Sequence, residues 1–234
     1  MKNSDQKRRI CVIVNSRANY GRIRSVLRAI EDRPDLELQL IVGASALLSR
    51  FGNVINLIRK DGFEPDATVY SIVEGENPTT MAKSTGMAIM ELATLFENLR
   101  PDIVLTVADR FETMATAVAA SYMNICLAHT QGGEVTGSID EKVRHAVTKL
   151  SNIHLVSNSQ ARDRVLRMGE PAETVHVTGC PSVDLADRIL VLVDGLIVGA
   201  GTKTELLAGS EEYRRIATAG LDGDRNGAEV EDSP

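Results

Sequence analysis

Residues Cys126 to Leu150 read CLAHTQGGEVTGSIDEKVRHAVTKL. The pattern predicts a buried strand over 125–128, then a polar, glycine-broken loop from His129 to Gly137, and then a helix. Ser138 is the expected N-cap of that helix, and Glu141, three residues later, completes a capping box. A strand, loop and helix in this order is typical of the carboxyl ends of strands in an open parallel sheet, where ligands bind.

Four chemically active side chains converge on this loop and on the start of its helix. The loop carries Glu134, the first helical turn carries Asp140, and Arg144 and His145 follow one turn later. Two carboxylates, a cation and an imidazole would suit a catalytic or binding site. A simpler interpretation is that Asp140 opposes the helix dipole and that Arg144 is its i,i+4 partner. The residues alone leave both interpretations open.

Strands alternate with helices over the rest of the chain as far as about Val177. Strands are expected at 10–14, 36–42, 67–72, 103–107, 153–156 and 175–178, and helices up to residue 31 and at 78–99, 111–123 and 159–168. This alternation predicts a Rossmann-like, doubly wound parallel α/β sheet with right-handed crossovers. Because no G-x-G-x-x-G follows the first strand, nothing indicates NAD binding.

Composition excludes several classes of function. A net charge of -6 and 3% aromatic residues argue against nucleic-acid binding, which needs a clustered basic face and stacking platforms. No apolar run approaches the roughly 20 residues of a membrane span, and the first residues lack a signal-peptide core, so we expect no membrane association and a cytoplasmic protein. The cysteines Cys11, Cys126 and Cys180 are interpreted as reduced core thiols, and no metal-binding spacing is present.

Two more candidate residues follow strands. Asp109 comes at the carboxyl tip of the strand 103–107, which faces the ligand crevice in such sheets, although it would also serve as a helix cap. Arg17 lies in the turn after the first strand, where free helix amides can bind a phosphate, although many such arginines are only solvated. His129 ends its strand and is a candidate for lining the crevice, whereas His154 and His176 are interpreted as structural.

Five ordered motifs resemble the hydrolysing UDP-N-acetylglucosamine 2-epimerases. The motifs are HTQGGEVTGSIDEKVRHAVTKLS at 129–151, SRANYG at 16–21, MAKSTG at 81–86, ADRFET at 108–113 and TGCPSVD at 178–184, and together they cover about residues 9–185. The resemblance implies the first half of a two-domain, glycosyltransferase-B-like fold. It also implies an enzyme that converts UDP-N-acetylglucosamine to N-acetylmannosamine and UDP, for sialic acid and related sugars, without a cofactor.

The resemblance assigns roles to the candidate residues. It implies three catalytic carboxylates, which are Asp109, Glu134 and Asp140. It also implies substrate-binding side chains at Arg17, Arg110, Gln131, Arg144 and His145. Arg17 and Arg144 would contact the diphosphate. The sequence departs from the family pattern at Asn19, where the family usually has Asp, and at Ala108, where it usually has Gly.

The chain after Leu185 follows another pattern. About fifty residues remain, fewer than the hundred or more expected for a second domain. Residues 186–217 resemble the end of ABC-transporter ATP-binding domains, with a hairpin signal at Asp194-Gly195 and Thr202 as the N-cap of a helix over 203–208. Residues 199–204 imitate a P-loop but lack its spacing. The expected domains are 1–185, 186–219 and a disordered, acidic segment at 220–234.

Three hypotheses about function remain open from the sequence. The chain is a nucleotide-sugar enzyme, active alone or with a partner that supplies the missing half; or it is a non-catalytic UDP-sugar-binding module; or it is an inactive fusion remnant. We expect UDP-N-acetylglucosamine or UDP to be the ligand. The sequence leaves the oligomeric state open, with a homo-oligomer as one alternative.

Overall fold

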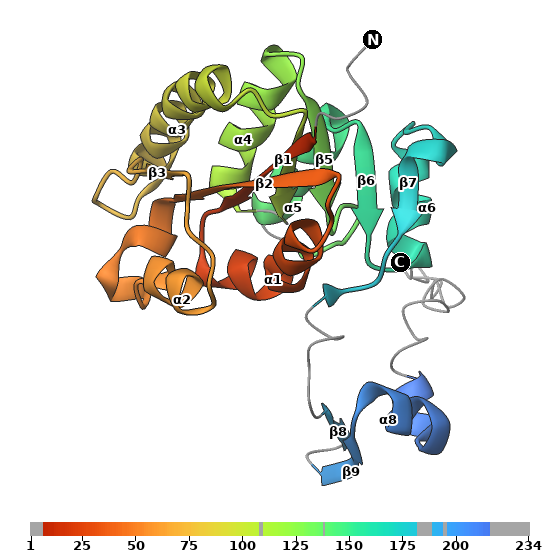
Figure 1. The fold of residues 1–234 in the computed structure, drawn as a ribbon. Coiled ribbons are helices and arrows are strands. Elements are labelled where there is room, and N and C mark those ends of the chain that lie inside the picture. The colour runs from red at the N-terminus through yellow and green to blue at the C-terminus, as the bar shows by residue number, and fades with distance from the viewer. Residues whose placement is uncertain (1–6, 108–109, 138, 182–188, 194–195, 216–234) are drawn as a thin grey trace, which may run out of the picture.

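The computed structural model describes residues 7–107, 110–137, 139–181, 189–193 and 196–215 (Figure 1). Seven parallel strands form one sheet in the order β3-β2-β1-β4-β5-β6-β7. The strands are β1 Arg8–Val14, β2 Leu36–Gly43, β3 Ala67–Val69, β4 Ile103–Val107, β5 Cys126–Thr130, β6 Ile153–Val156 and β7 Val175–Val177. The predicted doubly wound parallel α/β fold is therefore confirmed.

Helices cover both faces of this sheet because its central strands are apolar on both sides. The main helices are α1 Arg17–Glu31, α2 Val54–Lys60, α3 Pro78–Leu99, α4 Phe111–Tyr122, α5 Ile139–Leu150 and α6 Ser159–Arg167. The 3-10 helices of the same region are η1 Ala44–Leu47, η2 Ser49–Phe51 and η3 Ala172–Thr174. Val12 of β1 packs in one core with α1 and α2, whereas its neighbours Cys11 and Ile13 pack in a second core with α3, α4 and α5. The strand order reverses between β1 and β4, so the crevice of the fold opens at their carboxyl ends.

Some predicted boundaries differ from the structure. β5 continues through His129 and Thr130, which pair with Thr106 and Val107 of β4, so the loop begins later than its polar sequence suggested. Ser138, the predicted N-cap of α5, lies outside the described residues. The carboxylate of Glu141 accepts from the amides of Thr136 at 2.9 Å and Gly137 at 2.6 Å, so this side chain holds the end of the loop against α5.

The segment after residue 188 contains a small unit of its own. β8 Ile189–Val193 and β9 Leu196–Gly201 pair antiparallel, and α8 Lys203–Gly209 follows them. Thr202 caps α8, as predicted, and Glu205 completes a capping box with it. The predicted turn at Asp194-Gly195 and the predicted disordered segment 220–234 lie outside the described residues. None of the helices in the described part of the chain combines the length and apolar character needed to cross a bilayer.

Candidate functional site

Buried polar side chains gather at the carboxyl ends of β1 and β4. Asn15, Ser16 and Asn19 follow β1, and Glu112 and Thr113 begin α4 after β4, and each is 8% exposed or less. Burying a polar group costs free energy unless it is hydrogen-bonded. A cluster of this kind at the point where the strand order reverses marks the expected ligand site of the fold.

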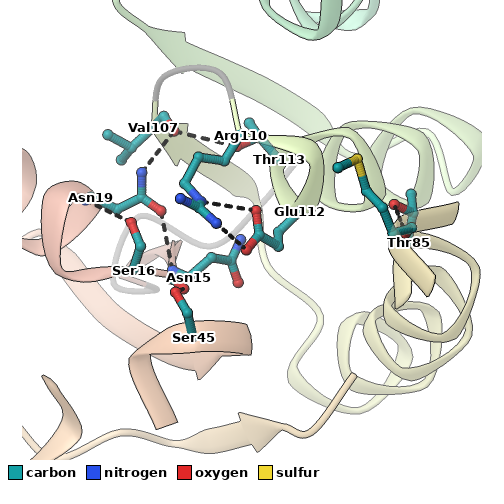
Figure 2. Close-up of polar contacts among 10 residues, drawn as sticks. Asn15, Ser16, Asn19, Ser45, Thr85, Val107, Arg110, Glu112 and Thr113 are labelled. Carbon is teal, nitrogen blue, oxygen red and sulfur yellow. Dashed lines mark hydrogen bonds and ion pairs between the residues drawn. The ribbon is translucent and has the colours of Figure 1, made fainter. Parts of the chain in front are cut away.

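Asn19 joins the ends of β1 and β4 (Figure 2). Its Oδ1 accepts from the amide of Asn15 at 3.3 Å, and its Nδ2 donates to the carbonyl of Val107 at 3.3 Å. Only one orientation of the side-chain amide satisfies both bonds. The Thr113 hydroxyl donates to the same Val107 carbonyl at 3.5 Å. The last described residue of β4 is thereby fixed from two helices.

Asp109, the first predicted catalytic residue, follows Val107 by two positions and lies outside the described residues. The described chain resumes at Arg110, whose backbone carbonyl accepts from the amide of Thr113 at 2.8 Å. The described residues on either side of Asp109 are therefore both hydrogen-bonded, Val107 to α1 and α4 and Arg110 to the first turn of α4.

Arg110 and Glu112 form an ion pair at the start of α4. The guanidinium Nε lies 3.2 Å from Oε2 of Glu112, and Nη2 lies 3.3 Å from Oε1 (Figure 2). The Glu112 side chain is 3% exposed, whereas that of Arg110 is 44% exposed. Burial raises the pKa of Glu112, the guanidinium of Arg110 opposes this rise, and Asp140 adds to it. The start of α5 lies beside the start of α4, since Phe111 and Met114 line one pocket with Ile139 and Val143.

Gln131 occupies a strained position at the tip of β5. Its φ of 61° is rare for a residue with a side chain. The backbone amide donates to Leu155 at 2.9 Å, the side-chain oxygen accepts from Arg22 at 3.1 Å, and Nε2 donates to the Cys180 thiol at 3.5 Å. This predicted binding residue is therefore tied to α1, to β6 and to the segment after β7.

The loop after β5 packs tightly on the start of α6. Gly133 has a φ of 79°, and a Cβ on it would overlap the carbonyl group of Ala161. The Glu134 carboxylate accepts from the hydroxyl of Ser157 at 2.7 Å. The predicted catalytic Glu134 thus has its side chain directed toward the junction of β6 and α6.

Arg144 contacts this same loop from α5. Its Nη1 donates to the Glu134 carbonyl at 2.6 Å, and the residue is 2% exposed. The observed contact therefore positions the loop, and contact of Arg144 with a phosphate stays a prediction. His145, the next residue, has Nε2 3.6 Å from Oε1 of Glu141, so it lies beside the loop end that Glu141 holds.

Arg17 approaches the site from another direction. It is the first residue of α1 and is exposed. A Cβ built on Gly52, after η2, would lie 3.7 Å from its Nη1. The structure therefore places Arg17 near the end of η2, and it places the first turn of α5, which carries Asp140, beside the start of α4.

Sequence reasoning overlooked several residues of the site. Glu112 was hidden in an apolar, alanine-rich helix, and the contact between Arg22 and Gln131 joins positions 109 residues apart. His129, in contrast, was predicted as a candidate for lining the crevice, but it is fully buried beneath Gly132 of the loop. Its Nδ1 lies 3.3 Å from the Thr148 hydroxyl oxygen, and that hydroxyl donates to the backbone carbonyl of Arg144 at 2.9 Å, so the tautomer with a proton on Nδ1 satisfies both contacts. For Glu112, the sequence signal for a site residue was a charged side chain inside an otherwise apolar helix.

The fold and the polar cluster at its switch point are those of a doubly wound α/β domain with a candidate ligand site. Comparison with known protein families identifies the family to which this domain belongs. The sequence profile described as UDP-N-acetylglucosamine 2-epimerase matches residues 28–207, from α1 into α8. The chain belongs to the UDP-N-acetylglucosamine 2-epimerase family.

Curated relatives agree with this assignment. The chain is 36% identical over 177 residues to a UDP-N,N'-diacetylbacillosamine 2-epimerase (hydrolyzing) of Legionella pneumophila, covering 76% of the chain and 47% of that protein. It is 33% identical over 178 residues to a UDP-N-acetylglucosamine 2-epimerase of Neisseria meningitidis, covering 76% and 46%. The chain thus spans about half the length of the curated relatives it matches.

Solved structures show the same fold. A crystal structure of a UDP-N-acetylglucosamine 2-epimerase superimposes with a TM-score of 0.69 at 23% identity, over 76% of this chain and 50% of that one. The Neisseria meningitidis enzyme bound to UDP-GlcNAc superimposes with a TM-score of 0.67 at 19% identity, over 75% and 48%.

Proposed function

We propose that the chain is the nucleotide-sugar-binding part of a hydrolysing 2-epimerase, which releases UDP and N-acetylmannosamine from UDP-N-acetylglucosamine. The observation that carries this proposal is the meeting of three motif segments at the switch point: SRANYG after β1, ADRFET after β4 and the loop between β5 and α5. Relatives from Legionella and Campylobacter are named as hydrolyzing enzymes, and an Escherichia coli relative is named a polysialic acid biosynthesis protein.

The proposed reaction removes the proton at C2 of the sugar while UDP leaves from C1, and water then adds to the glycal intermediate. One carboxylate must act as a base at C2 and another must handle the proton of the water. We assign these tasks to Asp109, Glu134 and Asp140 without dividing them. Arg17 and Arg144 stay the predicted partners of the departing diphosphate, and Arg110, whose side chain is 44% exposed, is added to them. No cofactor is proposed, because the steps are proton transfers and the loss of a leaving group.

The remaining predicted binding residues act through the loop or from its edge. Gln131 and Arg144 hold the backbone of the loop from β6 and α5. His145 lies at the end of the loop, where it can reach a ligand. The division of the chain into 1–185 and 186–219 stays part of the proposal. Three free cysteines support a reducing, cytoplasmic location.

Turnover requires more than this crevice. The barrier to removal of a weakly acidic proton falls only when water is excluded and the sugar is fixed. Because the chain covers about half of its relatives, we propose that the 234 residues alone bind UDP-sugars weakly and turn them over at the background rate. The chain alone would then behave as a binding module until a second half, or a second copy, completes the cleft.

Calorimetry with UDP, UDP-N-acetylglucosamine and ATP tests the binding. Arg110→Ala should weaken the binding of UDP about tenfold, because a charge-assisted contact to the diphosphate is lost. Arg33→Ala is the matched control, since Arg33 pairs only with the exposed Asp35 among the described residues. Preference for ATP over both uridine ligands would contradict the proposal. Release of UDP and N-acetylmannosamine above background would contradict the need for a second half.

A further inference from the structure

The Glu134 carboxylate is held by a side chain that follows β6. Oε1 of Glu134 accepts from the hydroxyl of Ser157 at 2.7 Å, and Ser157 is the first residue after β6. Among the residues that the structure describes, Oε2 of Glu134 makes no hydrogen bond or ion pair. One oxygen of this carboxylate is therefore fixed at the carboxyl edge of the sheet, and the other is available to a ligand.

Asn158 fixes the direction of this hydrogen bond. Its Oδ1 caps α6 by accepting from the amide of Ala161 at 2.9 Å, so its Nδ2 is the nitrogen that donates to Oγ of Ser157 at 3.4 Å. A hydroxyl has a single proton to donate. Because Oγ accepts from Asn158, that proton is directed to Glu134. The start of α6 is thus joined to the carboxylate by a chain of hydrogen bonds with one direction, in which each bond polarises the next.

The backbone of the loop is held without Ser157. The Glu134 carbonyl accepts from Arg144 at 2.6 Å. The Gly133 carbonyl accepts from Arg164 at 3.3 Å. What Ser157 adds is a bond to the side chain of Glu134, whose ordering costs conformational entropy. Because this bond forms before a ligand arrives, part of that cost is removed from binding.

We propose that Ser157 is a positioning residue, which holds the Glu134 carboxylate in the orientation that meets the bound sugar. This role rests on the proposed function, which makes Glu134 one of the carboxylates that handle protons. A base must lie within hydrogen-bond reach of the proton that it removes, and a small displacement costs much of the rate. Ser157 acts through Glu134, and Asn158 acts through Ser157.

Calorimetry of the full chain with UDP and with UDP-N-acetylglucosamine tests this role. The ratio of the two affinities measures what the sugar adds to binding. We expect Ser157→Ala to reduce this ratio about fivefold, because the loss falls on the ligand that carries the sugar. Ser157→Thr keeps the hydroxyl and should restore the ratio. Ser151→Ala is the matched control, since it removes a hydroxyl bond of 2.7 Å to the Val147 carbonyl before β6, and it should leave the ratio unchanged.

A double-mutant cycle separates positioning from a purely structural role. In a Glu134→Gln chain, Ser157→Ala should leave the ratio at the value of Glu134→Gln alone, since the carboxylate on which Ser157 acts is gone. Asn158→Asp keeps an N-cap oxygen for α6 but gives Ser157 an acceptor in place of a donor. It should therefore reduce the ratio as Ser157→Ala does, while urea denaturation shows a free energy of unfolding close to that of the wild type.

An unchanged ratio in Ser157→Ala would overturn the positioning role, whether or not both affinities fall together. A full effect of Ser157→Ala in the Glu134→Gln chain would also overturn it. So would a wild-type chain that binds the two ligands equally, because Glu134 would then not meet the sugar. Each of these results leaves the binding of UDP in place. Absence of UDP binding by the wild-type chain would instead overturn the proposed function, and this role with it.

Discussion

Asn19 performs two tasks that a carboxylate cannot perform together. Its amide accepts from Asn15 and donates to the Val107 carbonyl, and the residue is 2% exposed. Asn19→Asp restores the residue that is usual in the family, but in this chain it would direct a buried negative oxygen at the Val107 carbonyl, so we expect about tenfold weaker binding of UDP-N-acetylglucosamine at pH 8. Binding should recover toward pH 5, where a protonated aspartic acid can donate. Calorimetry across this pH range measures both effects.

The control for this change is Asn152→Asp. Asn152 accepts from the amide of Leu127 at 2.9 Å at the opposite end of the sheet, and an aspartate keeps that acceptor. Its binding curve should follow the wild type at every pH. An equal loss of affinity in Asn19→Asp at pH 5 and pH 8 would show that the hydrogen bond donated to the Val107 carbonyl does not determine the binding of UDP-N-acetylglucosamine.

Glu112 is a buried carboxylate whose pKa is raised chiefly by burial. When the pKa of a carboxyl group is higher in the folded protein than in the unfolded chain, the folded protein binds more protons. The free energy of unfolding therefore falls as the pH rises from the ordinary carboxyl pKa through the raised pKa of the folded state. Glu112→Gln removes this titration and should stabilise the protein by about 1 kcal/mol at pH 7. Urea denaturation at pH 4 and pH 7 measures the difference. The exposed Glu173→Gln serves as control, and a less stable Glu112→Gln protein at pH 7 would show that the Arg110 pair outweighs desolvation.

The loop between β5 and α5 is held by close contact with α6. Gly133→Ala would place a methyl group into the Ala161 carbonyl at a positive φ, so we expect a loss of at least about 2 kcal/mol in unfolding free energy. Gly137→Ala is a matched control, because its φ is 70° and no atom of the described residues beyond its chain neighbours lies within 4 Å of the added carbon. It should cost only the backbone strain of about 1 kcal/mol. Equal losses in urea denaturation would mean that the contact with Ala161 relaxes freely.

Most elements of the sheet were predictable from the sequence, because apolar strands and capped helices alternate. Asn77 and Pro78 begin α3 as predicted, with the Asn77 side chain accepting from two amides. The end of β5 was not predictable, because His129 and Thr130 are polar yet pair with β4. The hydrophobic pattern of a sequence indicates where apolar residues recur. It does not indicate which polar residues pair with a neighbouring strand, because that pairing depends on the fold as a whole.

The candidate site was predictable as a location but not as a set of contacts. Spacing placed Asp140 and Arg144 on one helix, and the structure confirms that helix. Spacing did not show that the loop covers Arg144, nor that Glu112 is buried beside Arg110. Such contacts join elements that lie far apart in the chain, so a single sequence carries no local signal for them.

The chain as a whole contains two units of very different core size. The seven-stranded sheet has two large apolar cores, whereas the small unit has a cluster of Val191 from β8, Leu206 from α8 and Tyr213 from the segment after α8. A two-stranded hairpin with so small a core is marginally stable. Limited proteolysis followed by mass spectrometry should therefore cut first between Leu185 and Gly220. A hairpin segment as resistant as the sheet would contradict this expectation.

The outer strands of the large sheet are its shortest, β3 and β7 with three residues each. A short edge offers few unpaired amide and carbonyl groups to another chain, so the sheet resists edge-to-edge aggregation. The hairpin lacks this protection, since Leu190, Leu192 and Ile197 are each more than half exposed. When the protein is concentrated, self-association should begin at the hairpin, and a lysine placed there would keep the sample in solution at higher concentration.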